Sequence, residues 1–409
     1  MLNPQRTIDD LKELRALTGD ENGAQRVAFT ETWERARAFM CHKLKSLPVK
    51  VEVDEAGNQW ATLKGKSDRE VLIGGHIDSV PNGGWLDGCL NVLGGLEVLR
   101  RIASEGTPPV TVRLVDWADE EGARFGRSLF GSSACSGTMN PDELRNLRDK
   151  DGVSLIDALA RVGIDFDHIK ESHRQLANAK AYLELHIEQG PVLLNMGLPL
   201  GVVIGTFGVE RWRCTVTGQA AHSGSTPMNV RKDALLPISH LNIGQYDIAR
   251  KHGGVSTMGS VITKPGIVTS VVGEATFTLD QRHMEADKLA AMFHDAQELV
   301  AKAASNANVT AEWNKIWDIA PIPFDPMLQD FAEEAVLEVA GVSHRLPSGP
   351  LHDAPEMQRV GIPTVMLFVQ SLLGISHNKI EDTKEEHIAM SVQALDKLAS
   401  KTMAWIAAQ

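Results

Sequence analysis

The chain lacks the features that would tie it to a membrane, to nucleic acid or to an oxidising compartment. No run of about 18 apolar residues is present, so no membrane-spanning helix is predicted. The four cysteines are scattered among 409 residues without paired spacing, which favours reduced thiols over a disulfide scaffold. Lys and Arg number 41 against 53 Asp and Glu, a net charge of −12, and no basic tract is present, which disfavours a nucleic-acid partner.

The remaining bulk features are those of a globular protein. The N-terminal segment MLNPQRTIDDLKELRALTGD has no apolar core, so a secretory signal is not expected and a cytoplasmic location is predicted. A chain of 409 residues is too long for one ordinary hydrophobic core, which predicts two domains.

Apolar runs alternate with amphipathic segments, which predicts an α/β domain with helices around a mainly parallel sheet. The expected strands lie at 70–74, 110–117, 182–187 and 363–369. The expected helices lie at 30–47, 90–103, 328–340 and from 386 onward.

A different pattern interrupts this domain. Strands are expected at 211–218, 274–283 and 309–313, and helices at 229–252 and 287–306. This unit of roughly a hundred residues has a common domain size. We predict an α+β domain, 211–325, inserted into a discontinuous catalytic domain, 1–210 and 326–409.

The segment GGHIDSVPNGGWLDG places three possible metal ligands among turn-forming glycines. His76 ends a predicted strand, and Asp78 could accept one of its ring N–H groups and orient the imidazole. Asp87 stands where a helix begins, and its two oxygens could bridge two cations. Taken alone, the segment fits equally well a buried core histidine and a helix-capping aspartate.

A second cluster, DWADEEGARF, follows the strand at 110–117. Glu120 and Glu121 then stand at the carboxyl end of a strand, where open α/β sheets place ligand sites. One could bind metal while the other accepts a proton from water, although an isolated pair is usually a solvated acidic loop. His186 in LELHI and His377 in GISHNKIED would each, taken alone, more often be structural.

Together these residues favour a dinuclear metal site. Histidines and carboxylates without cysteine are the ligands of zinc, manganese, cobalt or nickel in hydrolytic sites. Two metals about 4 Å apart require a bridging carboxylate and further ligands on each ion. One assignment meets that count: Asp87 bridges, His76 and His377 bind opposite metals, and Glu121 and His186 complete the set.

These segments, with AHSGSTPMNVRKDAL and FTLDQRH, resemble the hydantoinase/carbamoylase branch of the M20 metallopeptidase-like amidohydrolases. That branch includes N-carbamoyl-L-amino-acid amidohydrolases, allantoate amidohydrolases and β-ureidopropionases. The resemblance covers nearly the whole chain. It implies the same five ligands and two divalent ions, with Glu120 as general base and Asp78 orienting His76. It also implies that the inserted domain is a lid that forms a homodimer.

The resemblance further implies which residues contact the substrate. His222 would stabilise the substrate's carbonyl oxygen, reaching the site of the partner subunit, and Arg282 would pair with a substrate carboxylate. Gln189 and His352 match positions that line the site. Thr269 stands where the family usually has an Asn that helps to hold this carboxylate.

Four other positions depart from the family pattern: Asn91 replaces a Gly, Gln370 a Pro, and Pro350 and Leu351 a small Ala-Gly pair. Because all four positions are expected to bear on the pocket or its walls, the identity of the substrate remains undecided by the sequence. The predicted reaction is hydrolysis of a linear amide or ureido C–N bond, with an N-carbamoyl amino acid as the expected substrate. The alternatives are the same chemistry on an allantoate-like ureide, an N-acyl amino acid, a dipeptide or an aromatic amide or amine, and a non-catalytic metal-stabilised dimer.

Overall fold

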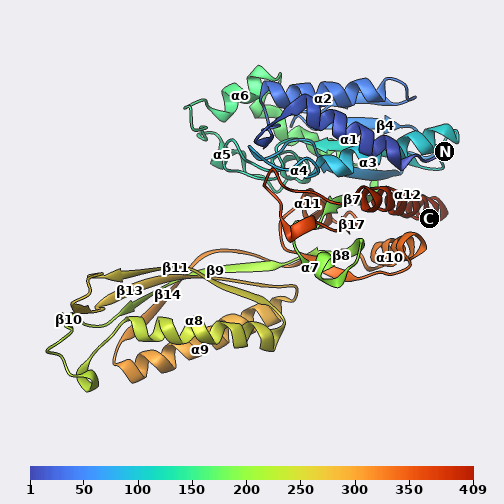
Figure 1. The fold of residues 1–409 in the computed structure, drawn as a ribbon. Coiled ribbons are helices and arrows are strands. Elements are labelled where there is room, and N and C mark those ends of the chain that lie inside the picture. Colours follow the sequence, from blue (N-terminus) through green and yellow to red (C-terminus); the bar gives the residue numbers. More distant parts are fainter. The chain divides into compact units, whose positions relative to one another are not determined.

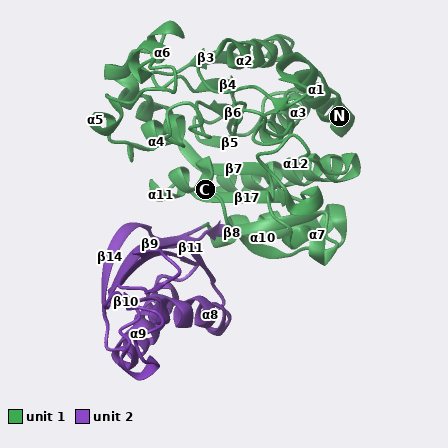
Figure 2. Cartoon of the chain, turned by 60° about the vertical axis from the view of Figure 1, so that its left-hand side comes forward, with its two compact units in different colours: residues 1–204, 324–409 green, residues 205–323 purple.

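The structure is a computed structural model that describes residues 1–409. The chain divides into two compact units, each considered by itself (Figure 2). Unit 1 comprises residues 1–204 and 324–409, and unit 2 comprises residues 205–323.

Unit 1 is built on a nine-stranded sheet in the order β15-β8-β17-β7-β5-β6-β4-β3, with β16 paired to β8 (Figure 2). Only β15 and the last two residues of β8 belong to the residues of unit 2. The strands are β3 (Lys50–Val53), β4 (Gln59–Leu63), β5 (Glu70–His76), β6 (Thr111–Trp117), β7 (Ala179–Ile187), β8 (Leu200–Thr206), β15 (Ile322–Pro323), β16 (Arg345–Ser348) and β17 (Thr364–Val369). Neighbouring strands from β17 to β6 are parallel, whereas β8, β4 and β3 join antiparallel. The predicted α/β class is confirmed, but the sheet is mixed, and only its centre is parallel.

Helices cover both faces of this sheet (Figure 1). The longer helices are α1 (Pro4–Thr18), α2 (Glu31–Leu44), α3 (Cys89–Ser104), α10 (Pro326–Ala340) and α12 (Glu385–Ala408). The shorter ones are α4 (Phe130–Ser136), α5 (Pro141–Leu144), α6 (Leu155–Arg161), α7 (Val192–Met196), α11 (Asp353–Arg359) and the 3-10 segments η1 (Phe166–Leu176) and η3 (Leu372–Gly374). A two-stranded hairpin, β1 (Gly19–Asp20) and β2 (Gly23–Ala24), follows α1.

The two faces of the sheet carry separate hydrophobic cores because successive strand side chains point to opposite sides. Ile73 of β5 packs into the core that contains α1, α3, α10 and α12. Its neighbour Leu72 packs into the second core, with Met357 of α11 and Cys135 of α4. All four cysteines are free thiols.

Unit 2 is an antiparallel sheet in the order β11-β13-β9-β14 with two helices on one face (Figure 1). Its elements are β9 (Gly208–Thr217), β10 (Ala221–His222), η2 (Met228–Val230), α8 (Leu235–His252), β11 (Val255–Lys264), β12 (Ser270–Val271), β13 (Glu274–His283), α9 (Ala286–Ala307) and β14 (Thr310–Ile319). Side chains of β13 alternate between buried and half-buried, and the buried ones, including Phe277 and Leu279, form the core with α8 and α9.

Two sequence predictions for this unit were wrong. The helix expected at 229–252 begins only at Leu235, because the preceding segment forms a 3-10 turn and the Asp233 side chain accepts a hydrogen bond from the Leu235 N–H. Strand β11 was missed altogether. Most of its residues are exposed or half-buried, and Ser256, Gly259 and Ser260 interrupt any alternation of apolar residues, so its sequence lacks the usual strand signal.

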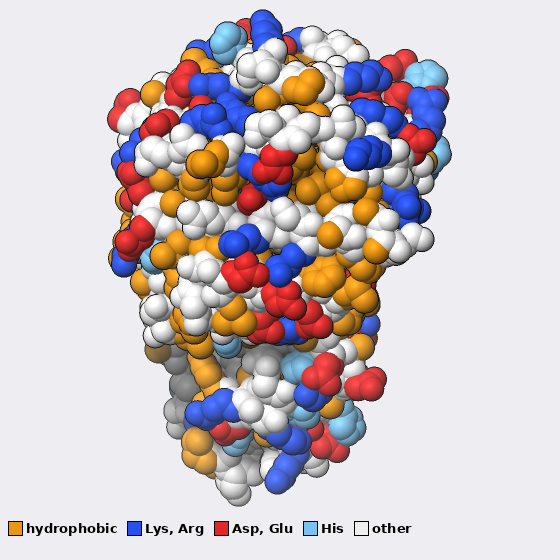
Figure 3. Space-filling model, turned by 90° about the vertical axis from the view of Figure 1, so that its right-hand side faces the viewer, with side chains coloured by type: hydrophobic (Ala, Val, Ile, Leu, Met, Phe, Trp, Pro, Cys, Tyr) orange, Lys and Arg blue, Asp and Glu red, His pale blue; other side chains and the backbone are white.

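On the face drawn in Figure 3, acidic and basic side chains are interspersed, and neither sign of charge covers a large continuous area. Between α10 and α12, ion pairs of opposite charge link Lys397 to Glu338 and Lys401 to Glu334. None of the helices combines the length and apolar character that a bilayer crossing requires.

Candidate metal centre and active site

The five predicted metal ligands come together at the carboxyl edge of the parallel strands. His76 is the last residue of β5, Glu121 follows β6, and His186 lies near the end of β7. His377 follows β17, and Asp87 precedes α3. Strands β6, β5, β7 and β17 are adjacent and parallel, so side chains at their carboxyl ends converge although they are far apart in sequence.

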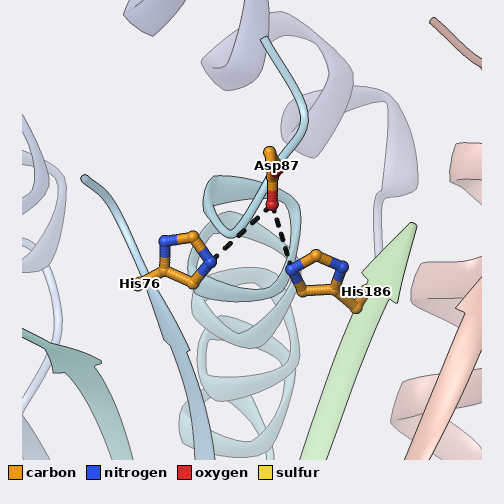
Figure 4. A group of neighbouring side chains, drawn as sticks. All are labelled: His76, Asp87 and His186. Carbon is orange, nitrogen blue, oxygen red and sulfur yellow. Dashed lines mark ion pairs between the residues drawn. The ribbon is translucent and has the colours of Figure 1, made fainter. Parts of the chain in front are cut away.

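Asp87 is the centre of the cluster, and its two oxygens face different partners. Figure 4 shows the imidazoles of His76 and His186 directed at one carboxylate oxygen. Asp87 Oδ1 lies 3.7 Å from His76 Nε2 and 3.2 Å from His186 Nε2. Asp87 Oδ2 lies 3.4 Å from His377 Nε2, which is in turn 3.3 Å from Glu121 Oε2. Two groups of three ligand atoms therefore share Asp87.

Backbone carbonyls fix the orientation of both buried imidazoles. His76 Nδ1 lies 3.2 Å from the Asp78 carbonyl oxygen, and His186 Nδ1 lies 2.9 Å from the Ile187 carbonyl oxygen. A carbonyl only accepts, so each Nδ1 donates its proton there and leaves Nε2 to face the centre of the cluster. Both Nε2 atoms are buried and face Asp87 Oδ1. A divalent cation between these nitrogens and the carboxylate would be stabilised by all three atoms.

The donor set therefore fits divalent metal ions. Imidazole nitrogen and carboxylate oxygen without thiolate suit zinc, manganese, cobalt or nickel. The side chain of His377 is 52% exposed, whereas the Asp87 and Glu121 side chains are at most 5% exposed, so the cluster is open to solvent on the His377 side.

Asp78 supports two parts of the cluster. Its Oδ1 lies 3.6 Å from His76 Nδ1, although the ring nitrogen is closer to the Asp78 backbone carbonyl. The Asp78 carboxylate also accepts hydrogen bonds from the backbone N–H groups of Glu120, at 3.3 Å, and Glu121, at 3.2 Å. This residue consequently ties the β5 end to the turn that carries both glutamates.

Glu120 lies beside the cluster without joining either group of three. Its Oε2 is 3.7 Å from His76 Nε2, and the residue is 7% exposed. Burial, together with the charges of Asp353 and Glu121, raises the pKa of Glu120 well above its usual range. Burial and the charge of Asp87 raise the pKa of Glu121 to about 9. Burial alone would also raise the pKa of Asp87, but the neighbouring imidazoles lower it.

Three polar residues hold Asp87 in place through hydrogen bonds, and two of them were missed from the sequence. Gln189 Nε2 donates to Asp87 Oδ2 at 3.0 Å, and Ser376 Oγ lies 3.0 Å from the same oxygen. Ser376 Oγ is also 2.7 Å from Glu381 Oε2, so its single proton can bond either carboxylate. Glu381 Oε1 accepts the backbone N–H groups of Leu86, at 3.1 Å, and Asp87, at 3.0 Å. Ser376 and Glu381 stand in the same GISHNKIED segment as His377, which is the signal that could have found them.

Two site residues have backbone conformations that non-glycine residues rarely adopt. Gln189 has φ of 59° and His377 has φ of 54°. Such strain persists only where surrounding contacts enforce it, and it concentrates at functional sites. The Gln189 N–H is held by Ser371 Oγ at 3.0 Å, which anchors this turn.

The substrate-contacting residues predicted from the resemblance fall into two groups. In unit 1, His352 packs its ring against His186 with centroids 4.4 Å apart, and its Nε2 bonds Ser348 Oγ at 3.0 Å. Burial and the nearby His186 lower the pKa of His352 well below its usual range. Gln189 hydrogen-bonds Asp87, as described above, so its amide is engaged with a predicted ligand.

In unit 2, the predicted residues lie in different sheets, His222 in the two-stranded sheet of β10 and β12 and Arg282 in the four-stranded sheet. His222 is in β10 and pairs with Ser270 of β12, and Ser223 N–H donates to the Thr269 carbonyl at 2.9 Å. Arg282 lies near the far end of β13, opposite Val209 and Val255, with its Nε 2.8 Å from Asp280 Oδ1. The structure thus brings His222 and Thr269 together but separates both from Arg282 within one chain.

Two of the departures from the family pattern are buried side chains that bond to the backbone. Gln370 is buried and its Nε2 donates to the Leu198 carbonyl at 2.8 Å, which supports the turn before β8. Asn91 is fully buried beneath the sheet and accepts a hydrogen bond from the Leu185 N–H at 2.9 Å. Each side-chain amide bonds a backbone group, the Leu198 carbonyl or the Leu185 N–H. A sequence pattern does not reveal such a role.

Comparison with known proteins identifies the family. The pattern of peptidase family M20/M25/M40 matches residues 72–401. The chain belongs to the M20 peptidase family. It is 33% identical to an N-carbamoyl-L-amino acid amidohydrolase of Geobacillus stearothermophilus, over 97% of each chain. It is 32% identical to the allantoate amidohydrolase of Escherichia coli, over 94% of this chain and 93% of that one.

Solved structures place this M20 member in a narrower branch. A hydantoinase/carbamoylase family amidase from Burkholderia multivorans superposes with a TM-score of 0.87 at 31% identity, covering 98% of each chain. The resemblance inferred from the sequence segments is thereby confirmed.

Proposed function

We propose that the protein is a metal-dependent amidohydrolase of linear ureido and amide C–N bonds, with N-carbamoyl amino acids as its substrates. The observation that carries the proposal is the pair of ligand groups sharing Asp87, with Glu120 beside them. The full-length similarity to an N-carbamoyl-L-amino acid amidohydrolase supports the substrate class. The nearly equal identity to an allantoate amidohydrolase makes a linear ureide such as allantoate the second candidate.

Two ions would share the cluster. His76, His186 and Asp87 Oδ1 would hold one, and Glu121, His377 and Asp87 Oδ2 the other. Bound there, divalent cations supply Lewis acidity that polarises a substrate carbonyl and lowers the pKa of a water molecule.

The chain's own residues would carry the proton and the developing charge. Glu120 would accept the proton of the attacking water and pass it to the leaving nitrogen. His222 would donate a hydrogen bond to the carbonyl oxygen as negative charge develops there. Arg282 would pair with the substrate carboxylate, for which its planar guanidinium is suited. One water then converts a carbamoyl amino acid into amine, ammonia and carbon dioxide.

The geometry of unit 2 favours a dimer in which His222 serves the partner's site. β13 from Glu274 to Arg282 spans about 26 Å at roughly 3.3 Å per residue. Arg282 pairs with the start of β9. β10, which carries His222, lies near the opposite end of the four-stranded sheet (Figure 1). One small substrate could not reach both residues of one subunit. Leu236, Ile243 and Tyr246 form an exposed apolar stripe on α8, beside the edge strand β11, that a second copy could cover.

A substrate panel tests the function. Protein loaded with zinc, manganese, cobalt or nickel is assayed for amine and ammonia release from N-carbamoyl-L-amino acids, allantoate, N-acetyl amino acids and dipeptides. We expect the highest kcat/KM with an N-carbamoyl amino acid. Faster hydrolysis of another class would move the substrate assignment to that class, and no release from any compound would favour a non-catalytic metal-stabilised dimer.

Two inactive variants test the general base and the dimer together. Glu120→Gln should retain metal and lose about 10²–10⁴-fold in kcat, the usual contribution of a general base. His222→Ala should also be inactive. If His222 acts across the dimer, subunit exchange between the two variants creates mixed dimers with one intact site and restores about a quarter of wild-type activity for a symmetric dimer. If His222 acts within its own subunit, no activity returns.

A further inference from the structure

Strands β5 and β7 separate just before the residues that carry the two buried histidines. Their parallel pairing runs from Glu70 with Ala179 to Ile73 with Leu183 and then stops. β5 nevertheless continues to His76 and β7 to Ile187. We call the point where the two strands separate the fork. Beyond it, the imidazoles of His76 and His186 are nearly parallel, with an angle of 28° between the rings and centroids 5.8 Å apart.

Asn91 fills the fork. It projects from the first turn of α3, is fully buried, and accepts the Leu185 N–H through Oδ1 at 2.9 Å. A β-carbon on Gly75 would lie 2.8 Å from Asn91 Nδ2 and 2.9 Å from Asn91 Cβ, so the side chain rests directly on the β5 backbone. The Leu185 N–H would otherwise be a buried donor without a partner, which costs about 1–3 kcal/mol.

The neighbouring glycine is required by the opposite face of the sheet. A β-carbon on Gly74 would lie 2.5 Å from the Tyr182 hydroxyl and 2.8 Å from Trp117 Nε1, which are hydrogen-bonded to each other at 2.9 Å. The two glycines before His76 therefore admit a ring on one face and the Asn91 amide on the other. The fork is packed from both sides and cannot close.

We propose that Asn91 is a positioning residue for the metal centre: it holds the β7 backbone at Leu185 while keeping β5 apart, and so sets the spacing between His76 and His186. The inference rests on the proposed metal site. Asn91 touches none of the ligand side chains in the hydrogen-bond network and acts only through the strands that carry them.

Substitutions at Asn91 distinguish the effect of its hydrogen-bond acceptor, Oδ1, from the effect of the space that its side chain fills. Asn91→Leu keeps the branching at Cγ in a larger side chain and removes the acceptor, whereas Asn91→Asp keeps an acceptor for the Leu185 N–H. Asn91→Gly removes the side chain altogether and is a second acceptor-lacking variant, to be used if the leucine variant does not fold. Val98→Ala, in the same helix and fully buried, is the control for general loss of stability.

Two readouts that do not depend on turnover test the proposal. Zinc affinity is measured by competition with a chelating dye, and exchange of the Leu185 amide by hydrogen–deuterium mass spectrometry. We expect Asn91→Leu and Asn91→Gly to bind zinc about 10–100-fold more weakly, as for other groups that orient metal ligands, and to exchange Leu185 faster. Asn91→Asp and Val98→Ala should resemble wild type in both. Wild-type zinc affinity and exchange in both acceptor-lacking variants would overturn the proposal, whereas a wild type that binds no metal would instead refute the metal site.

Discussion

Glu381 offers a strong single test of how the metal centre is assembled. The residue is 2% exposed, and its Oε1 accepts two backbone N–H groups, those of Leu86 and Asp87. Its Oε2 bonds Ser376 Oγ, which also contacts Asp87 Oδ2. Glu381 therefore holds both the backbone and, through Ser376, the carboxylate of the bridging ligand.

The expected cost of Glu381→Ala follows from these contacts. Each buried N–H left without a partner costs about 1–3 kcal/mol, so the two donors together cost about 2–6 kcal/mol. That is a large fraction of a total stability of about 5–15 kcal/mol. Loss of the support around Asp87 should also weaken metal binding about 10–100-fold.

The assay combines urea unfolding of the metal-free protein with zinc titration against a chelating dye. Glu381→Gln should retain most of the stability, because its amide oxygen can still accept both N–H groups and its NH₂ can donate to Ser376 Oγ. Glu386→Ala removes an exposed carboxylate close by and serves as the control. The reasoning is refuted if Glu381→Ala unfolds and binds zinc as the control does.

Two further predictions concern metal removal and pH. Chelation should abolish turnover and lower the unfolding temperature, because a ligand at a hundredfold its Kd stabilises a folded protein by about 2.7 kcal/mol. Adding zinc or manganese should restore both turnover and the unfolding temperature. An unchanged unfolding temperature after chelation would count against the metal site. Burial raises the pKa of Asp116 to about 6, only partly offset by the Arg37 guanidinium. The unfolded chain releases this proton nearer the usual value of 3.8, so the contribution of Asp116 to stability falls as the pH rises between these values and is constant above them. Asp116→Asn should remove that slope from urea unfolding measured between pH 4 and pH 7, and an unchanged slope would contradict the assignment.

Much of the fold was predictable from local pattern because the central strands are apolar on both faces. β6 is buried at every position, and β5 at every position after Glu70, and such runs are recognisable as strands between two helical layers. Strand β11 has no such signal, since it lies at an edge and its side chains are mostly exposed or half-buried. The start of α8 was misjudged because Asp233 forms a turn there, whose contribution depends on its local hydrogen bond.

The residues of the candidate site divide along a similar line. His76, Asp87, Glu121 and His186 stand at strand ends or at a helix start, and although each alone fits a structural role, their combination in one domain points to a metal site. Glu381 acts on a segment 294 residues away, and Asn91 on one 94 residues away. Their roles depend on which backbone donors the fold leaves unpaired, and that is decided only when distant strands meet.

The orientation of His76 and His186 depends on backbone atoms that the sequence does not reveal. Any residue supplies a carbonyl, so no sequence pattern could indicate that the carbonyls of Asp78 and Ile187 would fix Nδ1 of His76 and His186. Once they do, both Nε2 atoms face the same Asp87 oxygen, and the two imidazoles share one buried carboxylate. Without a metal, the surrounding carboxylates raise the pKa of both imidazoles, although burial opposes this, so protons offset the negative charge of the cluster. A divalent cation at the centre would take the place of these protons, so metal binding should release protons and become tighter as the pH rises.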